Sequence, residues 1–572
     1  MLKLIKNHHY AVLLAIIIGF LSFFPQVYGV LSMGDDFQGV YPLVCCTDET
    51  YYLTRAHDVI DGHGNLGNPF IFEYKNIPAL QFWIPDYLMA KSSVIVGGDI
   101  HKMFITYDLI FPIILTILTY SITFLLTRNK ILSLSTAALL HLGLFLNIFT
   151  RSPSPQFNFI FFLSLLFFLI RYLQGRDKKW IILSTLNLGL LFHFYTYYWT
   201  YFFVLLPIFV FLSIIFLKKE LSIKPFIYSI LGALVIAIPY FVQLYRSSQL
   251  PFYEETLFRM GMLNNHFPSG TLIVFGGGIL TLLLLFLLWR KIISINPVSV
   301  FIFSAVISTI IAVNHHIITG KYLEFSSHYR NLSIFIFIFT SAYIVSALLN
   351  RFDFKFKKFV PILIFISVFI FSLPHVAFTI NRQSTVEKLE YDWQRYGGVF
   401  NWLNENTPRD SVVYGNREFS KLVSAYTHNN VFYSDSVLLH FMPSDEIIDR
   451  FVISNYFNND FKDLPNEFFL KNERRIWGIS YVNRFLKQQS ENRIRNLIGL
   501  DVVEVERLPQ EEIKKVRDRY TEISDMSFKE NLSPYKVDYL IWDSREDSKW
   551  RLPKGSLKEV NKVGEFVIYE II

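Results

Sequence analysis

The sequence predicts an α-helical polytopic membrane protein with about eleven transmembrane helices and a C-terminal extracytoplasmic α/β domain. Of its 572 residues, 52% are hydrophobic and 18% are charged, whereas about 25% are charged in an ordinary soluble protein. The apolar residues form blocks of roughly 17–25 residues as far as Ile380, a length that crosses a bilayer. After Ile380 the blocks stop and charged residues become frequent. We therefore expect a membrane domain over residues 1–380 and a soluble domain over 381–572.

The first apolar block covers residues 10–30 and follows two lysines. It lacks the small-x-small site of a cleaved signal peptide, so we expect an uncleaved first helix. The other expected transmembrane helices cover 103–127, 131–150, 157–173, 180–197, 199–217, 225–245, 271–289, 297–314, 332–350 and 359–380.

Basic residues alternate between the loops and set the orientation. Loops assigned to the inside hold groups such as Lys178 with Lys179 and Lys357 with Lys358, whereas most outer loops hold few. Positive residues favour the cytoplasmic side, so we expect the N-terminus inside, the C-terminal domain outside and the protein in the plasma membrane. The same loops account for the net charge of +7, and no nucleic-acid partner is expected.

The long loops 31–102, 246–270 and 315–331 then lie outside, and function is expected on that face. The soluble tail has an α/β pattern. Its expected strands cover 411–415, 501–505, 537–542 and 565–571, and its expected helices cover 395–406 and 511–523.

The first outer loop, residues 31–102, contains the most informative residues. Thr47 suits a helix N-cap, with Asp48 and Glu49 in the first turn. Asp48, Tyr52 and Arg55 would share one face of that helix, with Asp48 and Arg55 about 10 Å apart along its axis. Such a carboxylate and guanidinium can bracket a ligand that has one group to deprotonate and one anionic group. The alternative is that Asp48 and Glu49 only cap the helix.

This loop resembles that of a known family. The residues are Asp48-Glu49-Thr50-x-Tyr52, then a Gly/Asp/His stretch ending in Pro69, then Phe72-Glu73-x-Lys75 with Pro78 and Trp83 nearby. They look like the first periplasmic loop of the GT-C glycosyltransferases, in the branch of the protein O-mannosyltransferases and the lipid A aminoarabinose transferase. The order of one helix, an acidic outer loop, a helical bundle and an extracytoplasmic domain is also similar.

The resemblance implies transfer of a sugar from a polyprenyl-phosphate donor to a glycan, lipid or protein acceptor outside the membrane. Asp48 matches the catalytic acidic position and Glu49 its neighbour. Lys75 is similar to the loop lysine that meets the donor phosphate, although the family has Glu-Lys-Pro contiguous and here Glu73, Lys75 and Pro78 are spread out. Arg55 and Tyr52 are further candidates for donor contact.

The chemistry suits these residue types. A carboxylate of pKa about 4 can accept a proton from a hydroxyl as the bond to the anomeric carbon forms. An anionic side chain also stabilises an oxocarbenium-like transition state. The leaving phosphate is best held by arginine or lysine.

Two other groups of polar residues are candidates. Asp35 and Asp36 form an acidic pair outside the first helix; in oligosaccharyltransferases, a GT-C branch, an acidic residue in this region helps to bind a divalent metal. The resemblance thus leaves Mg²⁺ or Mn²⁺ open as a cofactor, with interfacial solvation as the alternative. Lys321, His328 and Arg330 could hold phosphate or sugar, with interfacial anchoring as the alternative.

The start of the tail, residues 402–413, looks like the segment that opens the soluble domain of oligosaccharyltransferases. Tyr414-Gly415-Asn416-Arg417 stands where their Trp-Trp-Asp-Tyr-Gly motif should follow, so protein N-glycosylation is disfavoured. The rival functions are a lipid-carrier transporter or flippase, an O-antigen-type ligase or polymerase, and a non-catalytic membrane scaffold. A transporter needs charges near the bilayer midplane, and Asp108 is the only candidate.

Overall fold

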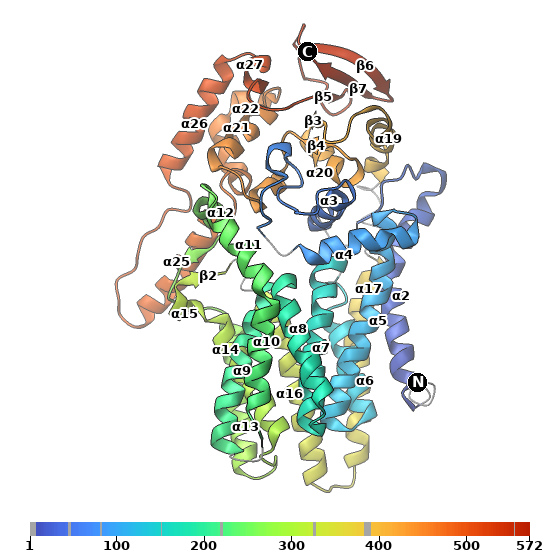
Figure 1. The fold of residues 1–572 in the computed structure, drawn as a ribbon, viewed down its shortest axis with the longest axis vertical. Helices are drawn as coiled ribbons and strands as arrows, with labels where there is room; N and C mark the ends of the chain where they lie inside the picture. The colour runs from blue at the N-terminus through green and yellow to red at the C-terminus, as the bar shows by residue number, and fades with distance from the viewer. Residues whose placement is uncertain are drawn as a thin grey trace.

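The computed structural model describes residues 7–43, 47–80, 83–149, 151–217, 221–323, 328–381, 391–553 and 555–572. Its long apolar helices form a bundle, and an extramembrane part lies across one end of that bundle (Figure 1). In Figure 1 the chain can be followed through the bundle by its colour, from the blue α2 (His9–Met33) to the yellow α17 (Val360–Asn381).

Eight helices in the described part of the chain are long and apolar enough to cross a membrane. The spans contain α2 (His9–Met33), α5 (Ile100–Thr127), α7 (Asn158–Gly175), α9 (Thr196–Phe216), α13 (Thr271–Trp289), α14 (Pro297–Val313), α16 (His328–Arg351) and α17 (Val360–Asn381). Neighbouring turns lengthen some of them, so that α14 belongs to a span over Pro297–Thr319. A pair bent by 49°, α10 (Lys224–Ile236) and α11 (Ile238–Ser248), makes a ninth if it is one span.

Two further apolar segments are helical but shorter. The helix α6 (Lys130–Ala138) continues into η4 (Leu139–Leu144), and α8 (Lys178–Phe194) has 17 residues. Helices therefore occur in each predicted apolar block, whereas the predicted number of eleven crossings stays a prediction. Large apolar side chains on the outer helices, such as Leu282 at 69% and Leu363 at 61% exposed, face away from the protein, as expected of a membrane bundle.

The first outer loop contains α3 (Thr47–Ile60) and α4 (Ile84–Ser92). In Figure 1, α4 lies across the end of the bundle, while α3 lies above it. Pro85 near the start of α4 suits a first helical turn, where the missing N–H costs nothing.

The tail contains a five-stranded sheet in the order β4-β3-β5-β7-β6. Its strands are β3 (Val412–Tyr414), β4 (Asn430–Val431), β5 (Tyr539–Asp543), β6 (Leu557–Val563) and β7 (Phe566–Ile571). The first three are parallel, and β7 is antiparallel to both β5 and β6. Three predicted strands are confirmed. The prediction of a strand at 501–505 is wrong, because this exposed segment pairs with no strand.

Both predicted helices of the tail are found, as α19 and α26. The helices of the tail are α19 (Gly397–Asn406), α20 (Arg417–Tyr426), α21 (Ser444–Ser454), α22 (Asn459–Asp463), α23 (Pro465–Lys471), α24 (Glu473–Ile476), α25 (Ser480–Leu497), α26 (Gln510–Asp525) and α27 (Phe528–Leu532). Outer loops of the bundle add α12 (Tyr253–Arg259), β1 (Leu263–Asn264), α15 (His316–Thr319) and β2 (Lys321–Tyr322).

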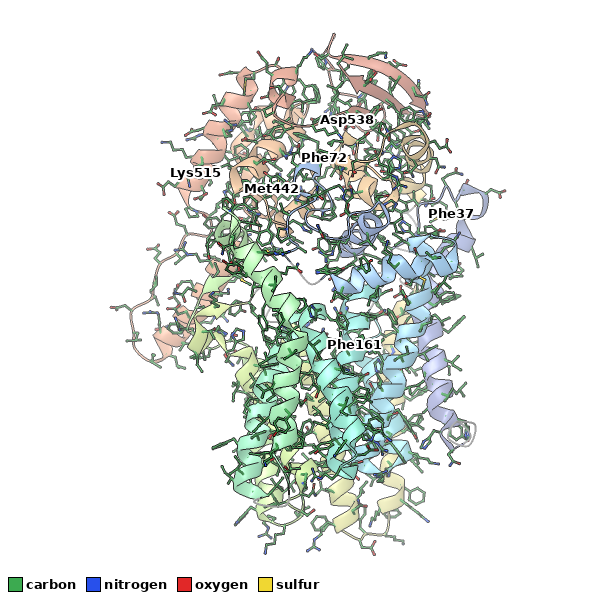
Figure 2. The ribbon with its side chains drawn as sticks, viewed as in Figure 1. Phe37, Phe72, Phe161, Met442, Lys515 and Asp538 are labelled. Carbon is green, nitrogen blue, oxygen red and sulfur yellow. The ribbon has the colours of Figure 1, made fainter. Side chains whose placement is uncertain are left out.

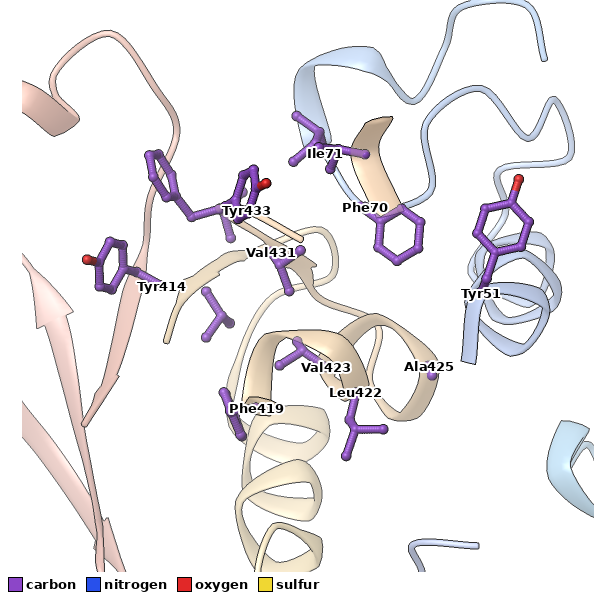
Figure 3. Close-up of a cluster of buried hydrophobic side chains, with 14 of the residues drawn as sticks. Tyr51, Phe70, Ile71, Tyr414, Phe419, Leu422, Val423, Ala425, Val431 and Tyr433 are labelled. Carbon is purple, nitrogen blue, oxygen red and sulfur yellow. The ribbon is translucent and has the colours of Figure 1, made fainter. Parts of the chain in front are cut away.

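The first outer loop and the tail share one hydrophobic core. Tyr51 and Phe70 of the loop pack in the same cluster as Phe419 and Val431 of the tail (Figure 3). Val431 N also donates to Phe70 O at 3.0 Å. The loop and the tail pack as one unit, although the boundary at residue 380 separates them in the sequence. We refer to the two together as the extramembrane body.

Figure 2 illustrates the same arrangement. Phe72 of the loop lies in the upper part of the molecule with Met442 and Asp538, well apart from Phe161 of the bundle. Lys536 Nζ is 4.1 Å from the centre of the Phe72 ring. The loop is thus held against the tail by polar as well as apolar contacts.

Candidate functional site

An exposed ion pair lies where the extramembrane body meets the bundle. Asp48, in the first turn of α3, has a side chain that is 62% exposed. Arg151 Nη1 donates to Asp48 Oδ2 at 2.6 Å. Arg151 directly precedes η5 (Ser152–Phe157), which leads into α7. A charge-assisted contact of this length fixes the carboxylate while leaving it open to solvent.

Glu49, the neighbouring acidic residue, points into the protein. Its side chain is buried, and Gln26 Nε2 of α2 donates to Glu49 Oε1 at 3.0 Å. This bond attaches the start of α3 to the first membrane helix. Glu49 therefore has the geometry of a positioning residue, whereas Asp48 has that of a residue that can meet a ligand.

A third acidic residue holds the segment that carries Arg151. Asp108 of α5 is buried, and its Oδ1 accepts from Ser152 Oγ at 2.8 Å and from Gln156 Nε2 at 3.0 Å. Glu49 lies within electrostatic range of Asp108. Asp108 thus fixes η5 against α5, which places Arg151 opposite α3.

Tyr52 lies behind the ion pair, one helical turn after Asp48. It is 8% exposed, and the Arg151 guanidinium carbon is 5.7 Å from the centre of its ring. Burial raises the pKa of the Tyr52 hydroxyl, although Arg151 and a hydrogen bond with Ser154 oppose this. Tyr52 therefore remains a neutral hydrogen-bonding group at physiological pH.

His328 and Arg330 approach the same place from α16. Tyr195 contacts His328 Nδ1 through its hydroxyl, and the His328 ring stacks on Tyr197 with centroids 4.9 Å apart. Both Arg151 and Arg330 lie within electrostatic range of His328. Arg330 itself is exposed. Arg151, which contacts Asp48, thus also lies near His328, as does Arg330.

Lys321, the third predicted residue of that loop, lies in β2 and is exposed, opposite Asn264 of β1. Residues 324–327, between Lys321 and His328, are outside the described part. So are Cys46 and the side chain of Thr47, and with them the predicted helix cap.

Arg55 does not share an open surface with Asp48, in contrast to the expected bracketing of a ligand. Arg55 Nη2 donates to Asp86 Oδ2 at 2.9 Å, and both side chains are 1% exposed. Burial acts to lower the pKa of Arg55, but Asp86 and Tyr51 hold it above its ordinary value. The charge of Arg55 is neutralised inside the extramembrane body, so we do not assign it to a donor phosphate.

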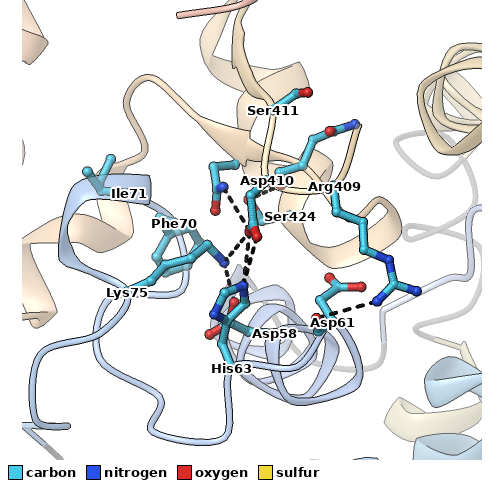
Figure 4. Close-up of polar contacts among 12 residues, drawn as sticks. Asp58, Asp61, His63, Phe70, Ile71, Lys75, Arg409, Asp410, Ser411 and Ser424 are labelled. Atoms are coloured by element: carbon cyan, nitrogen blue, oxygen red, sulfur yellow. Dashed lines mark hydrogen bonds and ion pairs between the residues drawn. The ribbon is translucent and has the colours of Figure 1, made fainter. Parts of the chain in front are cut away.

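Lys75 is likewise inside a buried charge cluster (Figure 4). Its Nζ donates to Asp58 Oδ1 and lies 3.6 Å from Asp410 Oδ1, and its side chain is 6% exposed. His63 Nε2 is 3.0 Å from each carboxylate oxygen of Asp410. This cluster joins the first loop to the tail, so Lys75 has a structural position rather than the expected position at a donor phosphate.

Burial and charge act differently on the two carboxylates of this cluster. Burial raises the pKa of Asp58, although Lys75 opposes this. Burial also acts to raise the pKa of Asp410, but Lys75 and His63 together lower it.

Asp35 and Asp36 lie on a short turn, η1 (Gly34–Asp36), and both are exposed. The described residues contain no group of three or more His, Cys, Asp or Glu that could hold a metal ion. Within those residues the pair therefore has no third metal-ligating side chain beside it. We therefore derive no step through Mg²⁺ or Mn²⁺.

Sequence reasoning missed the role of Arg151 and Gln26. The sequence alone shows Arg151 only as a basic residue in a short loop between two apolar blocks. The available signal was its position in Arg151-Ser152-Pro153, a short connection close to the membrane surface. For Gln26 it was a lone amide in an otherwise apolar helix, which usually has a partner.

Comparison with known proteins leaves the family open. No protein-family model matches the sequence, and no curated protein matches it. Among solved structures, the chain is similar to a crystal structure of the Archaeoglobus fulgidus oligosaccharyltransferase tethered to an acceptor peptide with the NVT sequon. The identity is 12% and the TM-score 0.42, over 75% of this chain and 64% of that chain. The chain thus spans less than two thirds of that protein's length, and at this level the likeness decides neither family nor function.

Proposed function

We propose that this chain is a membrane glycosyltransferase of the GT-C type, which moves a sugar from a polyprenyl-phosphate carrier to an acceptor outside the membrane. The observation that carries the proposal is the exposed Asp48 carboxylate, held by Arg151 at the boundary between the bundle and the extramembrane body. A donor with a lipid tail and a polar head needs its reacting carbon at such a boundary. There the tail can stay among apolar helices while the sugar meets a water-soluble acceptor.

In this proposal Asp48 is the general base. The acceptor oxygen forms a bond to the anomeric carbon, the bond from that carbon to the phosphate oxygen breaks, and Asp48 takes the acceptor proton. The polyprenyl phosphate leaves with the bonding electron pair. General-base assistance typically contributes about 10²–10⁴ to the rate. The negative charge of Asp48 also stabilises positive charge that develops on the sugar ring.

Arg151, His328 and Arg330 are the proposed contacts of the donor phosphate. A guanidinium has five N–H donors in a fixed plane, so its contact with Asp48 is compatible with a second anionic partner. Arg151 would then set the distance between base and leaving group. Tyr52 and Lys321 are the remaining candidates for contact with the sugar or the phosphate.

The proposed location is the plasma membrane, with the N-terminus inside and the extramembrane body outside. The basic inner loops support this orientation. Asp108 offers little support for a transporter, because its Oδ1 is engaged by Ser152 and Gln156 at the end of the bundle.

The decisive experiment is a transfer assay with radiolabelled polyprenyl-phosphate sugars on membranes, which supply the acceptor, from cells that make the wild type, Asp48→Asn or Asp35→Asn. Asn retains the shape of Asp but loses its charge and its affinity for a proton. We expect the wild type to release polyprenyl phosphate. The rate of release should be about 10²–10⁴-fold lower in Asp48→Asn and close to that of the wild type in Asp35→Asn. All three should elute alike in size-exclusion chromatography.

If Asp48 only capped α3, its replacement by Asn would cost well under ~1 kcal/mol of stability and leave turnover almost unchanged. That outcome would remove the assignment of the base. Lack of transfer by wild type with every polyprenyl-phosphate sugar would remove the proposed function itself.

A further inference from the structure

The end of α25 exposes a group of large apolar side chains on the extramembrane body. Leu497, Ile498, Leu500 and Val502 are 86%, 62%, 52% and 62% exposed. Several large apolar side chains close together on a surface mark a contact with a partner or with a membrane. We call residues 497–503 the α25 tip.

The α25 tip has a defined conformation. Asn492 Nδ2 donates to Val503 O at 2.8 Å, and Val503 N donates to Asn492 Oδ1 at 2.9 Å. Leu500 N donates to Arg495 O at 2.8 Å, across Gly499, whose φ of +73° suits a residue without a Cβ. The apolar side chains are therefore presented outward by a hydrogen-bonded turn that folds back on its own helix.

The α25 tip lies beside the end of an apolar span. The Arg495 guanidinium carbon is 5.6 Å from the centre of the Phe267 ring, shortly before α13 begins at Thr271. Leu272, the second residue of α13, is 81% exposed. In Figure 1, α25 lies next to β2 and α15, beside the end of the bundle that carries the extramembrane body. The exposed apolar surface of α13 and that of the α25 tip are thus at the same end of the bundle.

A second contact joins α25 to another span. Lys487 Nζ of α25 is 3.5 Å from the centre of the Tyr322 ring in β2. Just before β2, Ile318 of α15 is 86% exposed, at the end of the candidate span Pro297–Thr319. Exposed apolar residues thus lie at the ends of two spans, and α25 contacts the segments next to both through Phe267 and Tyr322.

We infer that the α25 tip inserts into the interfacial region of the bilayer and gives the extramembrane body a membrane contact of its own. Apolar faces of interfacial segments reach about 5–10 Å into the boundary between headgroups and acyl chains. Charges of opposite sign are mixed along the segment, so burial of apolar surface, rather than attraction to anionic lipid, drives the insertion. The charged residues between 480 and 504 are Arg484, Lys487, Glu491, Arg493, Arg495, Asp501 and Glu504. This inference does not depend on the proposed enzymatic activity.

The test uses a fluorescent label whose emission is quenched by nitroxide-bearing lipids. Cys45 and Cys46 are replaced by serine, and single cysteines are introduced as Leu500→Cys, Val502→Cys and the control Lys558→Cys. Lys558 is 64% exposed in β6, at the end of the extramembrane body away from the bundle (Figure 1). Each labelled protein is placed, one chain per disc, in phosphatidylcholine nanodiscs with and without doxyl-labelled lipid.

We expect doxyl lipid to quench the labels at 500 and 502 several-fold more than the label at 558, and adding anionic lipid to change this little. Quenching at 500 and 502 no stronger than at 558 would overturn the inference. If the label at 500 is shielded only when chains associate in detergent, the α25 tip contacts a second copy of the chain. That result would also overturn the inference. The positions are exposed, so cysteine is tolerated there, and elution like that of wild type in size-exclusion chromatography confirms folding of each variant.

Discussion

Gln26 and Glu49 form a buried hydrogen bond of 3.0 Å that joins the first membrane helix to the helix bearing Asp48. The two side chains come from elements that the sequence places in different environments, one apolar and one polar. Their bond determines where α3 begins relative to the bundle. It therefore also determines where the Asp48 carboxylate lies.

We predict that Gln26→Leu lowers the stability of the protein by about 1–3 kcal/mol, because Glu49 loses a buried donor. Turnover should fall more than the donor KM rises, since α3 moves while the phosphate contacts remain. The double variant Gln26→Leu/Glu49→Met should recover most of the stability, because it removes both partners. Thermal unfolding and donor kinetics measure these effects, with Ser32→Ala at the exposed end of α2 as the control. Equal stability of wild type and Gln26→Leu would show that the bond is unimportant.

We predict that Arg151→Ala raises the donor KM about tenfold or more, because a charge-assisted hydrogen bond contributes about 1.5–3 kcal/mol. Arg151→Lys should lie between Ala and wild type, since lysine keeps the charge but loses the planar donor set. The matched control is Arg246→Ala, an exposed arginine of α11. An unchanged donor KM in Arg151→Ala would transfer the phosphate contact to Arg330.

We predict that Lys75→Met destabilises the extramembrane body by about 3–5 kcal/mol, because Asp58 then remains buried without its cation. Donor KM should stay unchanged in the fraction that is folded. The control, Lys102→Met, removes an exposed pair with Asp99 and should cost about 0–1 kcal/mol. Thermal unfolding separates the two variants. A large rise in donor KM with normal stability would instead support a donor contact for Lys75.

We predict that Lys487 makes the protein more stable as the pH rises above 7. Burial lowers the pKa of Lys487 to about 7, so between pH 7 and the ordinary lysine pKa of about 10.4 the unfolded chain binds more protons than the folded chain. Stability therefore increases with pH across this range. Lys487→Met should flatten the increase and raise the melting temperature at pH 7, whereas Lys558→Met should do neither. A slope that persists in Lys487→Met would contradict this assignment.

The apolar blocks predict the bundle because a bilayer constrains length and composition locally. The local pattern also places Asp48 and Glu49 in the first turn of α3. It assigns Arg55 and Lys75 differently from the structure because their partners are distant in the chain. Asp86 is 31 residues from Arg55, and Asp410 belongs to the tail. A charge pattern gives the sign of a side chain, but not whether another segment neutralises it.

The same limit applies to the sheet. The short strand β4 and the edge strand β6 have no strong alternating pattern, so they were not predicted. The segment 501–505 has a pattern typical of a strand but no neighbouring strand to bond with. Arg151 could not be found from the sequence, because its position depends on Asp108, a residue of another helix that holds η5 in place.

The shared core of the first loop and the tail also sets an order of events during synthesis. The loop leaves the ribosome long before the tail that covers Tyr51 and Phe70. About 350 residues separate Phe70 from Phe419, which at roughly 5–20 residues per second corresponds to about 17–70 s. During that time the newly made loop carries uncovered aromatic side chains outside the membrane. The nascent chain is then open to proteases and in need of a chaperone on that side, until the start of the tail arrives and covers these side chains.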